Sequence, residues 1–390
     1  MLIPKLALKN IRGAGLRTWL NVIALSFAYV AIIFIQGLIN GMTHQMESVN
    51  IGAQYGGGQY WQKEYDPYDP LTLDDAHSKI PVELQQLVDE KKALPILIRQ
   101  ATIYPQGRMQ NALLKGIEID QNVLSIPTAA LVSDDNSIPA LIGSRMSKSM
   151  GLNKGDFLTV RWRDAQGKFD ANEVKIVEII NTAASDIDIG QLWIPLDRMR
   201  KMTSMPEEAT MIVLEQNSQF NNKISGWQYK NLDFLLKDLR SAMQVEQIGD
   251  SIFYIVLLLL AMLAIFDTQI LSLYRRRKEM GTLMALGMTR NNLIQLFTLE
   301  GAMHAVLAAV VGAIYGAPLF IYLATTGIKM PGGVDEMGFG LGDALFPIFS
   351  VGLIIKTLLI VLAITTIVSY IPTRKISRLK PTDALRGKLT

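Results

Sequence analysis

Few residues in this sequence have the types and spacing that chemistry requires. Its three histidines, His44, His77 and His304, lie far apart, and it has no cysteine, which excludes disulfides and thiolate metal sites. The sequence contains no G-x-x-x-x-G-K-[ST] to cradle nucleotide phosphates, no H-E-x-x-H and no G-x-S-x-G. We therefore expect no catalytic residue, no metal site and no cofactor bound by this chain, and we do not expect it to be an enzyme.

The segment from 275 to 290, RRRKEMGTLMALGMTR, is the strongest positive signal. Four cations, Arg275, Arg276, Arg277 and Lys278, end an apolar run and by themselves predict a topology anchor. Behind them, at helical spacing, a single stripe is formed by Met280, Leu283, Met284, Gly287 and Met288. This spacing predicts a helix of about three turns with one soft, polarizable face.

Two glycines interrupt this predicted helix, Gly281 and Gly287. In a helix each costs about 1 kcal/mol relative to alanine, a cost expected where backbones approach closely or where the helix ends. A helix that docks on a partner accounts for this composition better than a spacer does.

Ionisable side chains inside apolar runs are candidates for function. Asp267 is one; the alternatives are a role in transport, or exposure to water or pairing with a cation near the inner interface. Glu300 and His304 are four residues apart, a spacing that allows a hydrogen bond between them. Gly312 and Gly316 form a G-x-x-x-G pair, which predicts close helix packing within one subunit rather than dimerisation.

The elements that position these residues are apolar helices. Hydrophobic residues make up 49% of the 390 residues, and about 20 apolar residues are needed to cross a membrane as a helix. We predict four spans, at 17–41, 251–274, 292–324 and 350–372. The first is too long for the apolar part of a signal peptide and is interpreted as a retained anchor.

Charge placement predicts the orientation of these spans. Fifteen of the 38 cations lie in three segments, 1–17, 275–291 and 373–390. By the positive-inside rule both termini and residues 275–291 are cytoplasmic. Residues 1–16 are then an interfacial helix or a simple basic flank, 325–349 a periplasmic loop and 373–390 a cytoplasmic tail. The net charge of +3 gives no argument for a nucleic-acid partner.

Residues 42–250 are predicted to form a large α+β domain outside the membrane. Alternating stretches at 96–105 and 111–119 predict strands, and 79–94 has a helical pattern. Residues 138–162 are expected to form a glycine-capped helix, a turn and a strand, with a hairpin turn at 164–170. Residues 188–202 predict a strand, a proline boundary and a helix. One apolar face at 232–250 predicts a helical stalk.

The segment 275–301 resembles the cytoplasmic signature of the FtsX, MacB and lipoprotein-releasing (Lol) permeases. The resemblance rests on a basic residue, E-I-G-like and R-A-L-G-like elements, a T-R pair and a later F-x-x-E. These fall on Arg277, Glu279, Met280, Gly281, Ala285, Leu286, Gly287, Thr289, Arg290, Phe297 and Glu300. Met284 stands where the family usually has arginine. The tail is similar to the family's P-x-x-A-L-R ending at Pro381, Ala384, Leu385 and Arg386, and the order of spans and outer domain is the family's.

The resemblance implies an ABC transporter permease, closest to the lipoprotein-releasing members, in the bacterial inner membrane with its large domain in the periplasm. It implies ATP and Mg²⁺ only in a separate cytoplasmic ATPase subunit, a second permease subunit forming a homo- or heterodimer, contact with membrane lipid, and a possible periplasmic chaperone or adaptor. The residues implied to couple to the ATPase are Glu279, Met280, Gly281, Leu283, Ala285, Leu286, Gly287 and Arg290.

By this resemblance, hydrolysis would release lipoprotein-like or amphipathic substrates from the periplasmic side by mechanotransmission, the transfer of motion along helices. The 156–178 hairpin is short, as in a partner that lacks the family's chaperone-recruiting hook. The alternatives are MacB-like efflux of peptides or small amphipaths, an FtsX-like signalling permease, and a membrane-tethered sensor or binding protein that does not transport.

Overall fold

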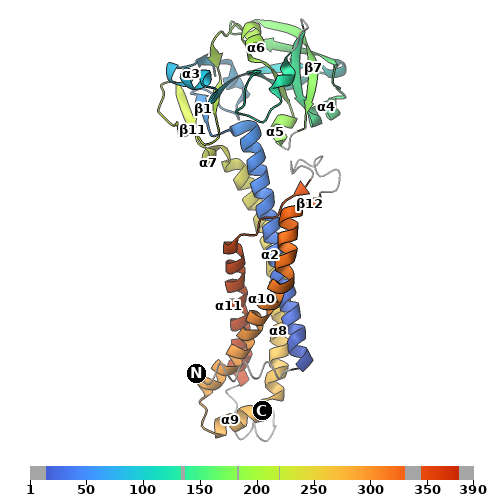
Figure 1. Ribbon diagram of the computed structural model, residues 1–390, viewed down its shortest axis with the longest axis vertical. Coiled ribbons are helices and arrows are strands. Elements are labelled where there is room, and N and C mark those ends of the chain that lie inside the picture. The colour runs from blue at the N-terminus through green and yellow to red at the C-terminus, as the bar shows by residue number, and fades with distance from the viewer. Residues whose placement is uncertain (1–14, 133–136, 182–183, 219, 330–343, 377–390) are drawn as a thin grey trace. The chain divides into compact units, whose positions relative to one another are not determined.

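The computed structural model describes residues 15–132, 137–181, 184–218, 220–329 and 344–376 (Figure 1). The chain divides into two compact units. Unit 1 comprises residues 1–42, 243–328 and 345–390, and unit 2 comprises 43–242 and 329–344. Nearly all of the predicted interfacial helix at 1–16 and of the tail at 373–390, including the tail motif, lies outside the described residues.

Unit 1 is built from long helices, α2 (Gly15–Asn50), α8 (Lys237–Arg275), α10 (Arg290–Thr326) and α11 (Val351–Ile376), with the shorter α9 (Arg277–Ala285) between α8 and α10. Three helical stretches of the described chain are long and apolar enough to cross a membrane, Trp19–Tyr55, Arg290–Thr326 and Val351–Lys375. The predicted span at 251–274 lies within α8, which is helical but not among those three, so its membrane crossing stays a prediction.

Helix α2 does not end at the Asn40–Gly41 pair, where the predicted first span ends. It continues to Asn50 and into a π-helical turn, η1 (Ile51–Tyr55). Polarity rises at that point, but each further residue of a formed helix adds a backbone hydrogen bond, so a change of polarity alone does not end it. Gly41 is also constrained, because a Cβ there would lie 2.2 Å from the carbonyl oxygen of Phe346.

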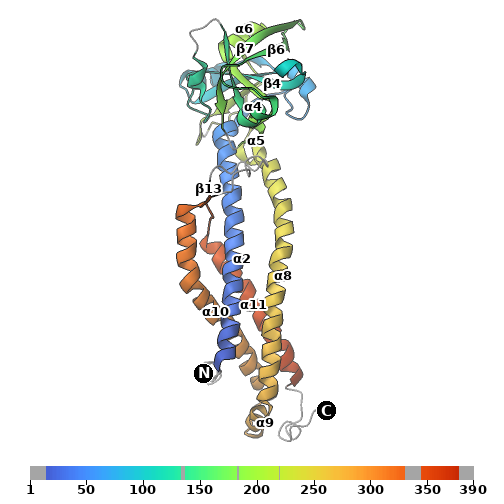
Figure 2. The same cartoon turned by 90° about the vertical axis from the view of Figure 1, so that its right-hand side faces the viewer.

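The four long helices share an apolar core in unit 1 (Figure 2). Its buried members come from α2, α10 and α11, and α8 packs against them through Leu258, Met262 and Phe266. The G-x-x-x-G pair of α10 lies against α2. A Cβ on Gly312 would lie 3.4 Å from the Ser26 carbonyl oxygen, and one on Gly316 would lie 2.9 Å from Val30 Cγ2. The close packing predicted within one subunit is confirmed.

Unit 2 contains a nine-stranded mixed sheet. Its strands are β1 (Gln59–Gln62), β3 (Ala93–Ile103), β4 (Gln110–Ile117), β5 (Ile138–Gly143), β6 (Phe157–Arg163), β7 (Phe169–Ile180), β8 (Gln191–Pro195), β10 (Met211–Leu214) and β11 (Trp227–Lys230). They run in the order β11-β1-β10-β3-β4-β8-β5-β7-β6, and β6 also pairs with β3. The last six strands of that order therefore close into a ring, while β10, β1 and β11 extend the sheet beyond it.

Alternation along the strands divides the interior of unit 2 into separate cores. Leu97, Ala101 and Ile103 of β3 face the inside of the ring, whereas Leu94, Ile96 and Ile98 face the other side, as the two-residue period of a strand requires. Short helices complete the unit: α3 (Val82–Asp89), α4 (Ser144–Met150), α5 (Ser185–Asp188), α6 (Leu196–Thr203) and α7 (Leu232–Leu235). The predicted α+β composition of this region is confirmed.

Most local predictions for unit 2 agree with these elements, including the strands near 96–105 and 111–119 and the hairpin turn between β6 and β7. The prediction for residues 138–143 is wrong, because this stretch is strand β5 and the helix begins only at Ser144. All six residues of β5 are buried, and a continuous apolar run without alternation cannot be told from a buried helix by its pattern. The predicted stalk helix is also divided, with α7 and α8 separated at Leu236.

Candidate functional site

Helix α9 connects α8 to α10 at one end of unit 1 (Figure 1). It has nine residues, or about two and a half turns at 3.6 residues per turn. This is shorter than the predicted three turns, because Leu286, Gly287 and Met288 form its end rather than continue it. A single residue, Arg276, separates α9 from α8.

Gly287 ends α9 through a Schellman motif. Its φ of +96° lies in the left-handed region that glycine adopts readily. The Gly287 N–H donates to the Met284 carbonyl oxygen at 3.1 Å, and the Met288 N–H donates to that of Leu283 at 3.0 Å. These two bonds satisfy carbonyl groups that the helix end would leave unpaired. Of the two roles expected for such a glycine, close approach of backbones or the end of a helix, the structure shows the end of a helix at Gly287.

The methionine face of α9 is covered by the chain itself. Met280 is 2% exposed and lies in a cluster with Leu273 of α8 and with Leu293 and Phe297 of α10. Leu283, Met284 and Met288 pack against the same cluster. Sequence periodicity indicated the apolar face of α9, but it carries no information on which element covers that face.

Arg276 ties α9 to α10. Its Nε and Nη2 donate to the two carboxylate oxygens of Glu279 at 2.7 and 2.9 Å, and its Nη1 lies 2.9 and 3.0 Å from those of Glu300. The guanidinium also lies 4.9 Å from the Phe297 ring centroid. Two carboxylates on one planar guanidinium form charge-assisted bonds with fixed geometry. Arg276, predicted as a topology anchor, is thus also a structural joint between three helices.

The hydrogen bonds between Arg276 and Glu279 favour the charged forms of both side chains. Hydrogen bonds from Arg276 lower the pKa of Glu279, and the same bonds raise the pKa of Arg276. The side chain of Glu300 is only 8% exposed, and a carboxylate buried to that degree needs a charged or hydrogen-bonding partner. Arg276 is that partner.

Glu300 and His304 do hydrogen-bond, but through the backbone: Nδ1 of His304 lies 2.8 Å from the backbone carbonyl oxygen of Glu300. The Glu300 carboxylate pairs with Arg276. Arg276 lies 24 residues away in sequence, so helical spacing does not indicate this pair. Asp267, the other predicted intramembrane candidate, lies in α8 with its side chain exposed and is not part of this joint.

The residues predicted to couple to the ATPase fall on two opposite sides of α9 or just beyond its end. Met280 and Gly281 are buried and Leu283 is half-buried, whereas Glu279, Ala285, Leu286, Gly287 and Arg290 are exposed, together with Lys278 and Thr282. Leu286 is 80% exposed. Arg290 is the first residue of α10, whose cap is Thr289; the Thr289 hydroxyl accepts a hydrogen bond from the Asn292 N–H at 3.3 Å. The outward surface of α9 is therefore polar at its start and apolar at its end.

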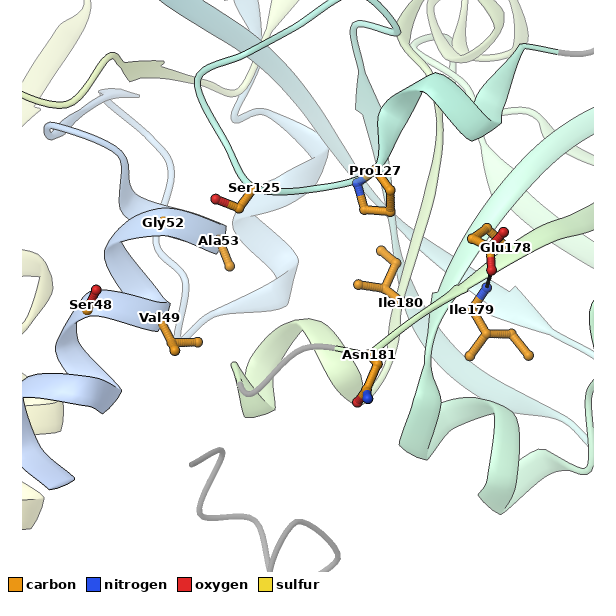
Figure 3. A pocket seen from close by; sticks show the side chains of 10 residues that line it. All are labelled: Ser48, Val49, Gly52, Ala53, Ser125, Pro127, Glu178, Ile179, Ile180 and Asn181. Carbon is orange, nitrogen blue, oxygen red and sulfur yellow. Dashed lines mark hydrogen bonds between the residues drawn. The ribbon is translucent and has the colours of Figure 1, made fainter. Parts of the chain in front are cut away.

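Unit 2 contains a pocket that the sequence did not predict (Figure 3). It has a volume of about 560 Å³ and lies between the end of α2, the loop near Ser125 and the end of β7. Its lining is Ser48, Val49, Gly52, Ala53, Ser125, Pro127, Glu178, Ile179, Ile180 and Asn181. One wall is the π-helical turn η1, a rare element that no sequence signal announced. Among the described residues, no three His, Asp or Glu side chains gather as a metal site would require.

Comparison with known proteins gives one family match. Residues 251–381 match the model of the FtsX-like permease C-terminal family, a segment that contains α9, α10, α11 and the greater part of α8. No curated protein matches. Among solved structures, the extracellular domain of the noncanonic ABC-type transporter YknZ from Gram-positive bacteria matches at 12% identity and a TM-score of 0.26, over 42% of this chain and 83% of that one. The C-terminal third of the chain is thus similar to FtsX-like permeases.

Proposed function

We propose that this chain is the permease subunit of an ABC transporter, and that the outward surface of α9 is where a separate ATPase subunit docks. The family match of residues 251–381 supports the permease role. The observation that carries the docking site is the orientation of α9: Met280 is buried, and Leu286 at the other side is 80% exposed. An exposed apolar side chain at the end of a fixed helix offers a partner apolar surface to bury.

The contacts that hold α9 against α8 and α10 suit a helix on which a partner exerts force. One residue, Arg276, links it to α8, and the bonds of Arg276 to Glu279 and Glu300 join it to α10 as well. The cluster around Met280 fills the space between the same three helices. A displacement of α9 is therefore passed to α8 and α10 rather than absorbed by a loose connection.

The wider proposal follows the charge pattern of the sequence. Residues 275–291 and both termini lie in the cytoplasm of a bacterial cell, four helices cross the inner membrane, and unit 2 lies outside. ATP and Mg²⁺ bind the ATPase subunit, a second permease subunit completes the transporter, and movement of the helices acts on substrate in the periplasm.

For the substrate, we propose lipoprotein-like or amphipathic molecules released from the membrane. Two stretches support this. Residues 21–42, NVIALSFAYVAIIFIQGLINGM, are similar to the first span of lipoprotein-releasing permeases, and residues 141–160, LIGSRMSKSMGLNKGDFLTV, are similar to part of their outer domain. The tip between β6 and β7 has only five residues, 164–168, so this chain would be the partner without a chaperone-recruiting hook.

Co-purification tests the proposal. The full-length chain, tagged and extracted from its native membrane in mild detergent, is expected to bring an ABC ATPase subunit and ATP hydrolysis with it. Leu286→Asp should abolish this association without unfolding the chain, because the side chain is exposed. Leu71→Asp is the matched control, since Leu71 in unit 2 is also 80% exposed.

Recovery of the chain without any nucleotide-binding subunit and without ATPase activity would contradict the proposal and favour a membrane-tethered binding protein. Equal association of the Leu286→Asp and wild-type chains would contradict the docking surface.

A further inference from the structure

The start of α8 is joined to the end of α2 by an arginine within unit 2. Arg240 is the fourth residue of α8, and Glu47 lies three residues before the last residue of α2. Nε of Arg240 donates to Oε1 of Glu47 at 2.7 Å, and Nη2 lies 3.3 Å from Oε2. The two residues are 193 positions apart in sequence, so this pair connects two helices that the chain itself connects only through the whole of unit 2.

The geometry of this joint is that of a fixed fork rather than a loose surface contact. Both oxygens of the Glu47 carboxylate receive a bond from the planar guanidinium, and the third nitrogen, Nη1, donates to Oδ1 of Asp233 at 2.9 Å. The side chains of Arg240 and Glu47 are 41% and 22% exposed. Bidentate pairing orients both helices as well as attracting them, and the bonds to the two carboxylates raise the pKa of Arg240.

Other contacts hold the same helix start to the sheet. The Tyr68 hydroxyl donates to the carboxylate of Asp238, in the first turn of α8. The ring of Phe234 in α7 packs edge-on against Trp61 of β1, with ring centroids 5.9 Å apart. The Lys230 ammonium lies over both rings, at 4.4 Å from Phe234 and 5.3 Å from Trp61. The contacts of Tyr68 and Phe234 attach the start of α8 to β1 and the loop after it, and Arg240 adds α2.

We propose that Arg240 is a positioning residue that fastens the end of α2 to the start of α8, so that these helix ends and β1 move as one body. Either helix then delivers its displacement to the sheet of unit 2. The source of the displacement, ATP hydrolysis in a subunit docked on α9, rests on the proposed function. The fastening itself does not.

Amide hydrogen exchange of the full-length chain tests the fastening directly. In Arg240→Met the end of α2, residues 43–50, should exchange about 1.5- to fivefold faster, the effect expected of one partly exposed charge pair on a local opening. The charge-swapped variant Glu47→Arg/Arg240→Glu, combined with Asp233→Asn because the Asp233 carboxylate also faces position 240, should restore slow exchange. Arg163→Met is the matched control, because Arg163 pairs with Asp74 at 3.0 Å and is 48% exposed, away from both helices. Unchanged exchange at 43–50 in Arg240→Met would overturn the proposal.

The second measurement concerns transmission and uses the complex with the ATPase subunit. Trapping wild type with ATP and vanadate should change exchange in β1 and β11, and Arg240→Met should lose at least half of that change while hydrolysis continues. A full response in Arg240→Met would overturn the role in transmission. If no ATPase subunit associates with wild type, the proposed function fails, whereas the exchange at 43–50 still decides the fastening.

Discussion

Nη1 of Arg276 lies 2.9 and 3.0 Å from the two carboxylate oxygens of Glu300, across 24 residues of sequence. This pair joins the residue before α9 to a buried position in α10, and the remaining nitrogens of the same guanidinium hold Glu279 within α9. This one side chain, together with the apolar cluster around Met280, holds α9 and therefore the surface that we propose for docking.

Replacing Arg276 with methionine should loosen α9. The change removes the bonds of the Arg276 guanidinium to the buried Glu300 carboxylate, at a cost of about 2 to 3 kcal/mol. Thermal unfolding in detergent and exchange of the α9 amides measure it. Arg276→Lys keeps the charge but loses the fork and should fall between wild type and methionine. Equal stability of all three chains would contradict the joint.

Gly287→Ala should weaken association with the ATPase subunit. No atom lies within 4 Å of a Cβ placed there, so the cost, about 1 kcal/mol, comes from holding φ at +96° and not from a clash. Gly155 in unit 2 is a matched control, with φ +97° and equally open surroundings. Gly155→Ala should cost similar stability and leave the association intact. If Gly155→Ala and Gly287→Ala affect the association equally, the end of α9 has no special part in it.

The packing of α9 should weaken in acid. Hydrogen bonds from Arg276 lower the pKa of Glu279 below its ordinary value of 4.5. A carboxyl whose folded pKa lies below its unfolded one stabilises the fold above the unfolded value, and the contribution is lost as pH falls through the folded value. Exchange of the α9 amides should therefore be constant between about pH 5 and 8, after correction for intrinsic rates, and rise below that range. Glu279→Gln should remove the acid-induced rise.

Gly301→Ala should disturb the bundle. A Cβ on Gly301 would lie 2.0 Å from Oγ and 2.4 Å from Cβ of Ser369 in α11. The clash should cost about 1 to 3 kcal/mol, measured as a lower unfolding temperature. Gly352→Ala, with nothing within 4 Å, should be neutral or stabilising. Ser369→Gly should partly rescue Gly301→Ala, and absence of any rescue would show that α10 and α11 do not meet in this way.

The sequence predicted well those features that depend on local pattern and composition. The long helices, the α+β composition of unit 2, the hairpin turn at 164–170 and a short helix after Lys278 follow from periodicity, turn residues and charge. The prediction of a helix at β5 is wrong because all residues of β5 are buried, so the strand lacks the alternation that distinguishes a strand.

The contacts between distant segments could not be predicted. The methionine stripe was identified correctly as apolar, yet only the packing of Leu273, Leu293 and Phe297 shows that the chain covers it itself. Arg276 with Glu300 and Arg240 with Glu47 are pairs of residues in different elements, and a single sequence contains no signal that selects one charged partner among many.

Site-specific photo-crosslinking in native membranes tests the central claim most directly. A photoreactive amino acid in place of Leu286 should form a crosslink to a cytoplasmic nucleotide-binding subunit, and the same amino acid at Leu71, equally exposed in unit 2, should form none. If position 286 crosslinks only to lipid or to periplasmic proteins, the outward surface of α9 is not the docking site of an ATPase, and the proposed coupling through this helix is contradicted.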